Sequence, residues 1–349
     1  MKVAVVGAGV CGLSAAKTLA RRGHDVTLHE QFELFHGRGS SHGASRIVRR
    51  AYSDPFYTAC MSEAYPLWAE LERESERELV HEVGLVYFGS QDADNIRSVA
   101  TGLSDLSVPF EIYDHRQIHK VFPDLKLKDG EIGIWTPEAG WVNAASALKA
   151  LAEVGIQSGL SIQTGSVADV SRLANENDIV IVTAGAWITR ITDVPVKVTL
   201  QTFAYIDAQI GGPVWIEDSE DQPYGFPTDE QGQKVGIHRA GHEIDPEIDS
   251  RQPNEAYLDA IKTTVRDRFG IQTANLRHPK TCLYTTTVNE DFLLGNLAPN
   301  VFFGSACSGH GFKMGPWIGR LLADFAEGKD HPSNHPRFAS FPKQLSEYR

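Results

Sequence analysis

The chain has 349 residues, of which 42% are hydrophobic and 22% charged, so it has the composition of an ordinary globular protein with one large or two interleaved domains. Its formal net charge of −12 argues against nucleic acid or an anionic membrane as the main partner, and no apolar run is long enough to span a membrane. The four cysteines show no spacing typical of metal ligands or of a disulfide framework. Because a strand is predicted from the very start, we expect no signal peptide and a cytoplasmic protein.

Residues 2–30 predict a dinucleotide-binding unit. A strand of β-branched residues and Ala, VAVVG, is followed by Gly7, Gly9 and Gly12 in the spacing G-x-G-x-x-G, and then by an amphipathic helix. Gly7 suits the tight turn, Gly9 lets the backbone approach a pyrophosphate, and Gly12 lets the helix pack on the strand. The next strand ends in Glu30, whose carboxylate suits hydrogen bonds to a ribose. The unit predicts an ADP-containing cofactor and leaves NAD and FAD open.

The loop after Glu30 is rich in Gly and Ser and carries five cationic or titratable basic residues within thirteen positions. They are Arg38, His42, Arg46, Arg49 and Arg50. Such a concentration of basic residues in an acidic chain indicates a binding role, whereas the simplest alternative is an arginine-rich loop in solvent.

Residues 55–78 are predicted to form a helix with one buried face, and residues 79–136 are predicted to form an inserted α/β segment. A second helix is predicted within residues 135–155, entered through a turn at GWVN with Asn143 as the N-cap. A strand at residues 161–170 is then joined by a short connection to a buried strand, NDIVIVTAG, which should lie parallel to the first strand.

After residue 195 the predicted strands alternate in the manner of an antiparallel sheet, with a hairpin within residues 229–240. A polar helix at 253–270, strands at 282–288 and 300–306, and a last helix at 315–326 complete the chain. We therefore predict an α/β fold in which a Rossmann-type nucleotide-binding domain is interleaved with an α+β substrate domain built on a mostly antiparallel sheet. The predicted nucleotide-binding domain comprises residues 1–78, 137–190 and 289–349, and the predicted substrate domain comprises residues 79–136 and 191–288.

The segment SGHGFKMGPW places three glycines and Lys313 just before the last helix. A helix N-terminus and a lysine could stabilise the negative charge of a reduced flavin, or could hold a substrate carboxylate. A glycine-rich helix entry with a surface lysine fits the same residues, so both interpretations stay open at this point.

Several motifs together resemble the monomeric sarcosine oxidase family, which includes N-methyltryptophan oxidase and belongs to the D-amino-acid oxidase-like superfamily. The motifs are GSSHGASRIVRRAY, YGFP followed by K-x-G-x-H, HPKTCLYT, TAGAW and SGHGFK, and they run through nearly the whole chain in the family's order. The resemblance implies that the nucleotide-binding domain binds FAD.

The resemblance also implies which residues hold the flavin. Cys282 matches the cysteine that is linked covalently to FAD in this family, although a lone cysteine before a strand is usually a small core residue. Val167 could contact the adenine through its backbone, but the connection around it, residues 155–178, is shorter than in relatives, so the cover of the adenine is expected to differ. The full set of implied cofactor-binding residues is Gly7, Gly9, Gly12, Glu30, Ser41, His42, Ser45, Arg46, Val167, Gly185, Cys282, Gly309, Gly311, Phe312 and Lys313.

Six residues match positions in the family that handle substrate and oxygen. Arg49 and Lys313 match the pair that anchors the substrate carboxylate, a chemically sensible combination of a planar fork and a point charge. The resemblance assigns catalytic roles to Arg46 beside the flavin and to Lys234, the lysine credited with activating O2. Tyr224 and His238 match residues that line the substrate cavity and polarise it.

The expected activity is therefore the FAD-dependent oxidation of small amines that bear a carboxylate, with O2 as the second substrate. The C–N bond of an N-methyl, cyclic or other secondary amino acid would become an imine, and O2 would become H2O2. The alternatives are a flavin-dependent dehydrogenase that uses another electron acceptor, and a flavin-binding protein without activity. A monomer is expected because monomers are common among the relatives, and no metal is expected.

Overall fold

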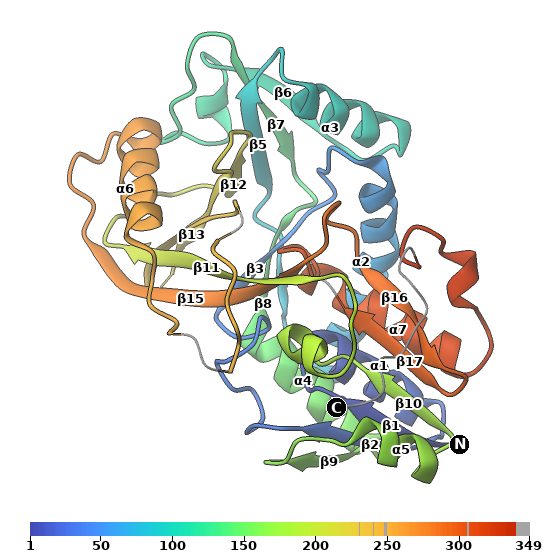
Figure 1. Cartoon of the computed structure of the whole chain (residues 1–349). Helices are drawn as coiled ribbons and strands as arrows, with labels where there is room; N and C mark the ends of the chain where they lie inside the picture. Colours follow the sequence, from blue (N-terminus) through green and yellow to red (C-terminus); the bar gives the residue numbers. More distant parts are fainter. Residues whose placement is uncertain (230, 240, 248–249, 306, 340–349) are drawn as a thin grey trace.

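The computed structural model describes residues 1–229, 231–239, 241–247, 250–305 and 307–339, and Figure 1 shows their arrangement around two large sheets. The six-stranded sheet has the order β16 (Leu293–Ala298), β17 (Val301–Ser305), β10 (Ile179–Val182), β1 (Lys2–Val6), β2 (Asp25–Glu30) and β9 (Ser161–Thr164). Positions 230 and 240 of the predicted hairpin, 306 of the predicted strand and 340–349 of the predicted domain lie outside the described residues.

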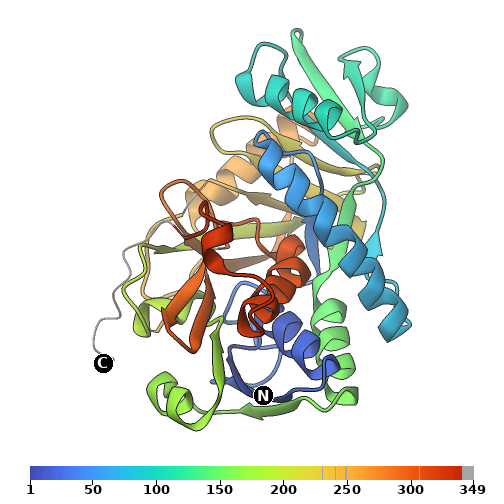
Figure 2. The ribbon, with the colours of Figure 1, turned by 90° about the vertical axis from the view of Figure 1, so that its right-hand side faces the viewer.

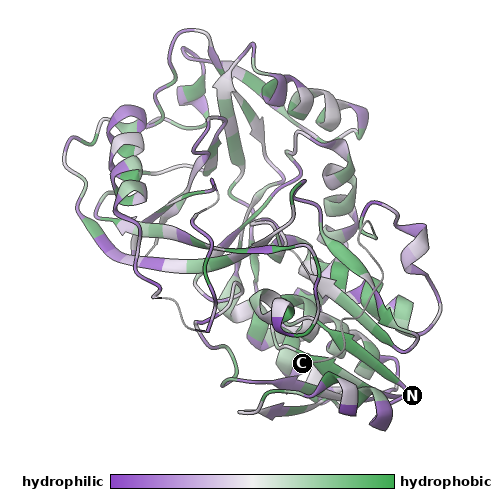
Figure 3. Cartoon of the chain, in the orientation of Figure 1, coloured by the Kyte–Doolittle hydropathy of each residue, from purple (hydrophilic) through white to green (hydrophobic). Residues whose placement is uncertain are grey.

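The six-stranded sheet is the predicted Rossmann-type sheet. Strand β1 pairs in parallel with β2 on one side and with β10 on the other, as the sequence predicts. Helices α1 (Val10–Arg21), α4 (Ala144–Gln157) and α7 (Gly315–Ala326) contribute apolar residues to a core shared with β1 and β2. Figure 3 shows the central strands of this sheet as hydrophobic, which agrees with their nearly complete burial.

The eight-stranded sheet draws its strands from two separate parts of the chain. Its order is β15 (Leu276–Thr286), β11 (Lys197–Ile206), β14 (Gly232–Ile237), β13 (Pro223–Asp229), β12 (Val214–Glu217), β5 (Leu85–Ser90), β7 (Glu131–Thr136) and β6 (Glu111–Asp114). Neighbouring strands are antiparallel except where β12 pairs with β5 in parallel. This parallel pair joins the inserted segment to the later strands, so the two parts form one mostly antiparallel sheet.

Helices link and cover the sheets. Figure 2 shows α2 (Pro55–Ser75) running along one side of the molecule from α3 (Asp94–Asp105) towards α4. The Asp54 side chain caps α2 by accepting a hydrogen bond from Phe56 N at 2.9 Å. On the eight-stranded sheet, α6 (Glu255–Phe269) buries its apolar face. None of the helices in the described ranges is long and apolar enough to cross a membrane.

The structure corrects three expectations about local structure. The GWVN stretch is not a turn but strand β8 (Gly140–Asn143), which lies in a small sheet with β3 (Ser45–Val48) and β4 (Val80–His81). The stretch before it is strand β7 rather than the start of a helix, and β16 is a strand at residues for which no element is predicted. These strands are short and exist through pairing with distant residues, which local propensity does not report. The predicted N-cap Asn143 is confirmed, because its side chain accepts a hydrogen bond from Ser146 N at 3.0 Å.

The connection between β9 and β10 is also more structured than expected. It contains a short helix, α5 (Val170–Glu176), capped by Asp169, whose side chain accepts a hydrogen bond from Arg172 N at 3.0 Å. Val170 packs against Val180 in the core on the second face of the six-stranded sheet. The connection is therefore short but completes one βαβ unit.

Candidate functional site

A cavity of about 1050 Å³ extends from the glycine-rich turn after β1 to the eight-stranded sheet and the entry of α7. It collects residues from every part of the chain that the sequence motifs singled out. All the predicted site residues line it except Gly12 and Ser45. The lining set is Gly7, Gly9, Glu30, Ser41, His42, Arg46, Arg49, Val167, Gly185, Tyr224, Lys234, His238, Cys282, Gly309, Gly311, Phe312 and Lys313.

The glycine-rich turn forms one end of the cavity. Gly7 has φ +101°, and a Cβ there would lie 2.4 Å from the carbonyl oxygen of Thr183. A Cβ on Gly12 would lie 1.9 Å from the carbonyl oxygen of Gly7, so the helix packs against the turn as closely as glycine permits. Gly12 thus shapes the site from behind without touching the cavity.

Glu30 fastens this turn to the end of β2. Its Oε2 accepts a hydrogen bond from Ala8 N at 2.8 Å, and its Oε1 accepts one from Phe32 N at 3.0 Å. Burial by itself would raise the pKa of Glu30, but hydrogen bonds from His36 and from these two backbone N–H groups lower it below its ordinary value. The carboxylate is therefore ionised at neutral pH and beside the glycine-rich turn, where the dinucleotide prediction requires it.

Two cations lie in the middle of the cavity and are held by backbone carbonyls and aromatic rings. Arg46 Nη2 donates to Ser40 O at 2.7 Å, and its guanidinium carbon lies 5.7 Å from the Phe312 ring centroid. Lys234, which is 4% exposed, donates to Ser45 O at 2.9 Å. Its Nζ also lies 4.7 Å from the ring centroid of Phe203. Ser45 therefore acts through its carbonyl group and not as a wall of the cavity.

A second pair of cations, Arg49 and Lys313, faces the same aromatic ring. The Arg49 guanidinium carbon lies 4.2 Å from the Tyr52 ring centroid, and Lys313 Nζ lies 5.4 Å from it. Lys313 Nζ donates to His310 O at 3.0 Å. Burial first, and then the positive charge of Arg49, lower the pKa of Lys313 well below its ordinary value. Within the described part of the chain neither cation forms an ion pair with a carboxylate.

Two histidines of the cavity are held in the neutral form. Burial, followed by the positive charges of Arg49 and Lys313, lowers the pKa of His238 to about 4. Burial and the charges of Arg46 and Lys234 lower the pKa of His42 to about 4 as well. Neither imidazole adds positive charge at neutral pH. His238 Nδ1 lies 3.4 Å from the hydroxyl of Tyr284.

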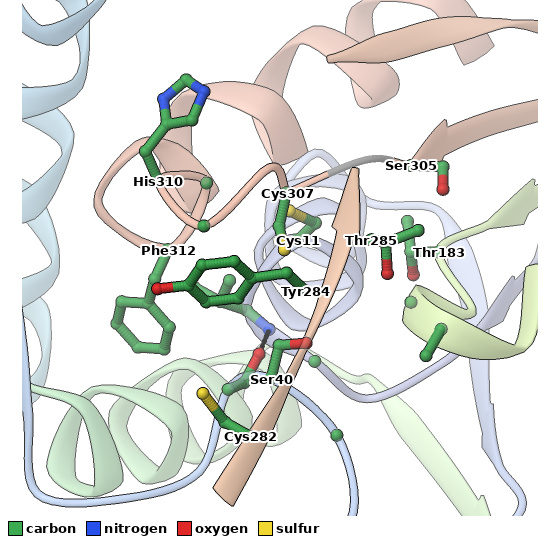
Figure 4. Close-up of a pocket in the computed structure, with 18 of the residues that line it drawn as sticks. Cys11, Ser40, Thr183, Cys282, Tyr284, Thr285, Ser305, Cys307, His310 and Phe312 are labelled. Atoms are coloured by element: carbon green, nitrogen blue, oxygen red, sulfur yellow. Dashed lines mark hydrogen bonds between the residues drawn. The ribbon is translucent and has the colours of Figure 1, made fainter. Parts of the chain in front are cut away.

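Cys282 projects from β15 into the cavity. Figure 4 shows its sulfur on the same side of the strand as the ring of Tyr284, near Phe312. Burial raises the pKa of the Cys282 thiol, while the charges of Arg46 and Lys234 act in the opposite direction. Of the other three cysteines, Cys60 is buried away from the cavity, whereas Cys11 and Cys307 line it.

Sequence reasoning missed several residues of the cavity wall. Tyr284 lies two positions after Cys282 on the same strand, and the period of two places both side chains on one face. This two-residue spacing could have identified Tyr284 from the sequence. Phe203 on β11 and Tyr52 after the basic loop also line the cavity, and nothing in the local pattern distinguishes them from core aromatics.

The cavity has the chemistry of a site for a polar ligand as large as a dinucleotide. Four buried side-chain atoms on its wall have no hydrogen-bond partner in the described part of the protein, namely His42 Nε2, Ser171 Oγ, Thr285 Oγ1 and Ser305 Oγ. Buried polar atoms without partners are costly, so a ligand that bonds to them would stabilise the protein. With the glycine-rich turn and the Glu30 carboxylate at one end, these residues fit FAD.

Comparison with known proteins decides the family. The model of the DAO family, described as FAD dependent oxidoreductase, matches residues 2–325. The chain belongs to this family. It is 30% identical to the peroxisomal sarcosine oxidase of Homo sapiens, over 92% of this chain and 91% of that protein. It is 25% identical to the N-methyl-L-tryptophan oxidase of Salmonella heidelberg, over 99% of this chain and 98% of that protein.

The fold agrees with this membership. The amino acid oxidase NikD superposes with a TM-score of 0.83 at 23% identity, covering 99% of this chain and 98% of that one. The predicted resemblance and the predicted fold class are confirmed, and the protein is a FAD-dependent oxidoreductase. In this oxidoreductase the cavity described above is the one that fits the cofactor.

Proposed function

We propose that this FAD-dependent oxidoreductase is an oxidase of small carboxylate-bearing amines, namely N-methyl, cyclic or other secondary amino acids. It would oxidise a C–N bond to an imine and reduce O2 to H2O2. The relatives named sarcosine oxidase and N-methyl-L-tryptophan oxidase support this substrate class, because both names refer to N-methyl amino acids.

The observation that carries the proposal is the pairing of Arg49 and Lys313 across Tyr52. Two cations in one buried place repel each other and raise the free energy of the site until an anion arrives. A carboxylate would accept hydrogen bonds from the planar guanidinium and from the ammonium, and its negative charge would favour the protonated form of Lys313. We therefore propose that these two residues hold the carboxylate of the substrate.

Bound FAD would supply the two-electron redox chemistry that amino-acid side chains lack. The glycine-rich turn and Glu30 would hold its ADP half, and the residues around Arg46 and Phe312 would lie beside its ring system. We propose that His238 and Tyr224 shape the substrate end, where a neutral imidazole does not compete with Arg49 for the carboxylate. Lys234 would stabilise the negative charge that develops on oxygen as O2 is reduced.

We also propose that the Cys282 sulfur forms a thioether with a methyl carbon of the FAD ring. The S–H bond and one methyl C–H bond would break, the two electrons would pass to the flavin ring, and O2 would then reoxidise the ring. Support comes from the position of Cys282 on the cavity wall, between the charges of Arg46 and Lys234. Acid precipitation of flavin-loaded protein tests the linkage, because the yellow colour should stay with the pellet. Colour that washes out entirely would refute it, and Cys282→Ser is the control that should always release its flavin.

The domain boundaries, the oligomeric state and the location in the cell are also proposals. We propose that the two large sheets correspond to the FAD-binding domain (1–78, 137–190, 289–349) and the substrate domain (79–136, 191–288). We propose a monomer acting in the cytoplasm, which size-exclusion chromatography and cell fractionation would test.

The activity itself is tested by measuring peroxide release with a panel of amines at saturating O2. The panel pairs each N-methyl or cyclic amino acid with its decarboxylated counterpart. We expect H2O2 only from the carboxylated member of each pair. Reduction of the flavin by the same compounds without peroxide release would favour a dehydrogenase, and absence of both would refute the proposal.

A further inference from the structure

Residues 242–247 and 250–251, between β14 and α6, lie between the eight-stranded sheet and the nucleotide end of the cavity. We call them the crossing segment. It begins as an addition to β11, since Leu200 N donates to His242 O at 3.0 Å and Ile244 N donates to Val198 O at 2.9 Å. The segment is therefore part of the framework of the eight-stranded sheet.

Ile244 fixes the segment against the residues that follow β10. It is 6% exposed and belongs to a small apolar cluster with Trp187 and Leu283, against which Phe32 also packs. Trp187 lies in the 3-10 helix Gly185–Arg190, and Phe32 lies in the loop after β2. The cluster thus joins elements of both sheets at one point.

Polar contacts tie the same segment to the nucleotide side. Trp187 Nε1 donates to Glu247 Oε1, and Arg190 forms an ion pair with Asp245. The Arg251 guanidinium donates to Arg38 O, in the loop after β2. It also donates to Pro246 O at 2.7 Å, and its central carbon lies 5.8 Å from the Trp187 ring centroid. Arg251 therefore joins the two described parts of the crossing segment through Pro246, and joins the segment to the loop after β2 through Arg38.

These contacts lie at the wall of the cavity near Glu30. Glu247, Trp187 and Arg190 line the cavity, as do His36 and Val167. Val167 is 80% exposed, so the short β9–β10 connection leaves that side of the cavity end open. Through Glu247, the crossing segment also contributes to the cavity wall.

We propose that the crossing segment is part of the ADP-binding site and retains the adenosine end of FAD. Its contribution is to hold Trp187 and Arg190 as a wall, through Glu247, Asp245 and Arg251. The contacts that hold this wall come from the chain segment that extends the substrate-side sheet, so cofactor retention depends on contacts between the two sheets. The inference rests on FAD binding, which family membership establishes, and is independent of the amine that is oxidised.

Two substitutions that conserve charge test the contacts of the crossing segment. Neither adds nor removes a charge near an anionic ligand. Trp187→Phe keeps an aromatic ring against Ile244 and removes the N–H that Glu247 accepts. Arg251→Lys keeps the positive charge but lacks the planar fork that reaches Arg38 O and Pro246 O together. Arg277→Lys is the matched control, because Arg277 is half-exposed, pairs with Asp207 and does not line the cavity.

All variants are made in the full chain carrying Cys282→Ser, so that the flavin is held without a covalent bond. The first measurement is the rate of FAD release after dilution, followed by the fluorescence of free flavin. The second is the thermal midpoint Tm of flavin-free protein with and without saturating ADP, which reports binding of the ADP half alone. Neither measurement involves turnover, so a failure of the proposed oxidase activity would not affect them.

We expect each test variant to release FAD about tenfold faster than the Cys282→Ser parent, the effect of one lost charged hydrogen bond. The rise in Tm caused by ADP should shrink in both test variants and stay unchanged in Arg277→Lys. Release rates within about twofold of the parent would overturn the proposal. A Tm lowered equally with and without ADP would overturn it too, because the segment would then support the fold and not the nucleotide.

Discussion

Replacing Lys313 by methionine removes one of the two cations that we assign to the substrate carboxylate, while keeping the length of the side chain. Lys313 is 5% exposed, so the lost interaction is not weakened by solvent in the way that a surface ion pair is. A hydrogen bond to a charged group contributes about 1.5–3 kcal/mol. We therefore expect kcat/KM for a carboxylated secondary amine to fall by about 10- to 150-fold.

The assay compares two substrates and two variants. Peroxide release is measured with a carboxylated amine and with its decarboxylated counterpart, which has no group for Lys313 to hold. Lys262→Met, on the exposed face of α6 and paired only with Asp259 at 2.9 Å among the described contacts, is the control. If Lys313→Met affects both substrates equally, or affects the carboxylated one no more than Lys262→Met does, Lys313 does not hold the carboxylate.

Three further predictions concern oxygen, packing and pH. Lys234→Met should slow reoxidation of the reduced enzyme by O2 about 10²- to 10³-fold while anaerobic reduction by substrate stays near its normal rate, and equal rates in stopped flow would refute the oxygen role. Gly12→Ala should destabilise the fold by about 1–3 kcal/mol in chemical denaturation, because its Cβ would lie 1.9 Å from Gly7 O. Gly37→Ala, whose Cβ would meet nothing within 4 Å, should leave stability unchanged, and similar losses in both would contradict the packing argument. His42 and His238 have folded-state pKa values of about 4, below the ordinary 6.5, so the unfolded chain binds more protons between these two values. Stability should therefore fall as pH drops from 6.5 to 4, and the double variant His42→Gln, His238→Gln should flatten that slope; an unchanged slope would show that neither residue is buried in the neutral form.

The two cation pairs concentrate positive charge at the cavity of a chain whose net charge is negative. The chain as a whole has a net charge of −12, yet Arg46, Arg49, Lys234 and Lys313 all face one cavity. Backbone carbonyls and aromatic rings contact them there. Within the described residues Arg49 and Lys313 form no ion pair with a carboxylate, so their charge is available for an anionic ligand.

Parts of the fold could be predicted because their causes are local. The turn after β1 needs a positive φ at Gly7, and the close packing of α1 needs the missing side chain of Gly12. Strands β7 and β8 could not be predicted in the same way. Strand β8 is four residues long and is held by pairing with β3 and β4, which lie far away in the sequence.

The sequence by itself predicted the Rossmann-type unit, the family and seventeen of the residues that line the cavity. These follow from glycine spacing, the acid at the end of β2 and motifs whose residues are close together in the chain. Only the tertiary structure decided that Arg49 and Lys313, more than 250 positions apart, face one tyrosine ring, and that Glu247 of the crossing segment accepts a hydrogen bond from Trp187 at the cavity wall. Such contacts join residues that are far apart in the chain, so no local sequence pattern reports them. They form only when both sheets are assembled.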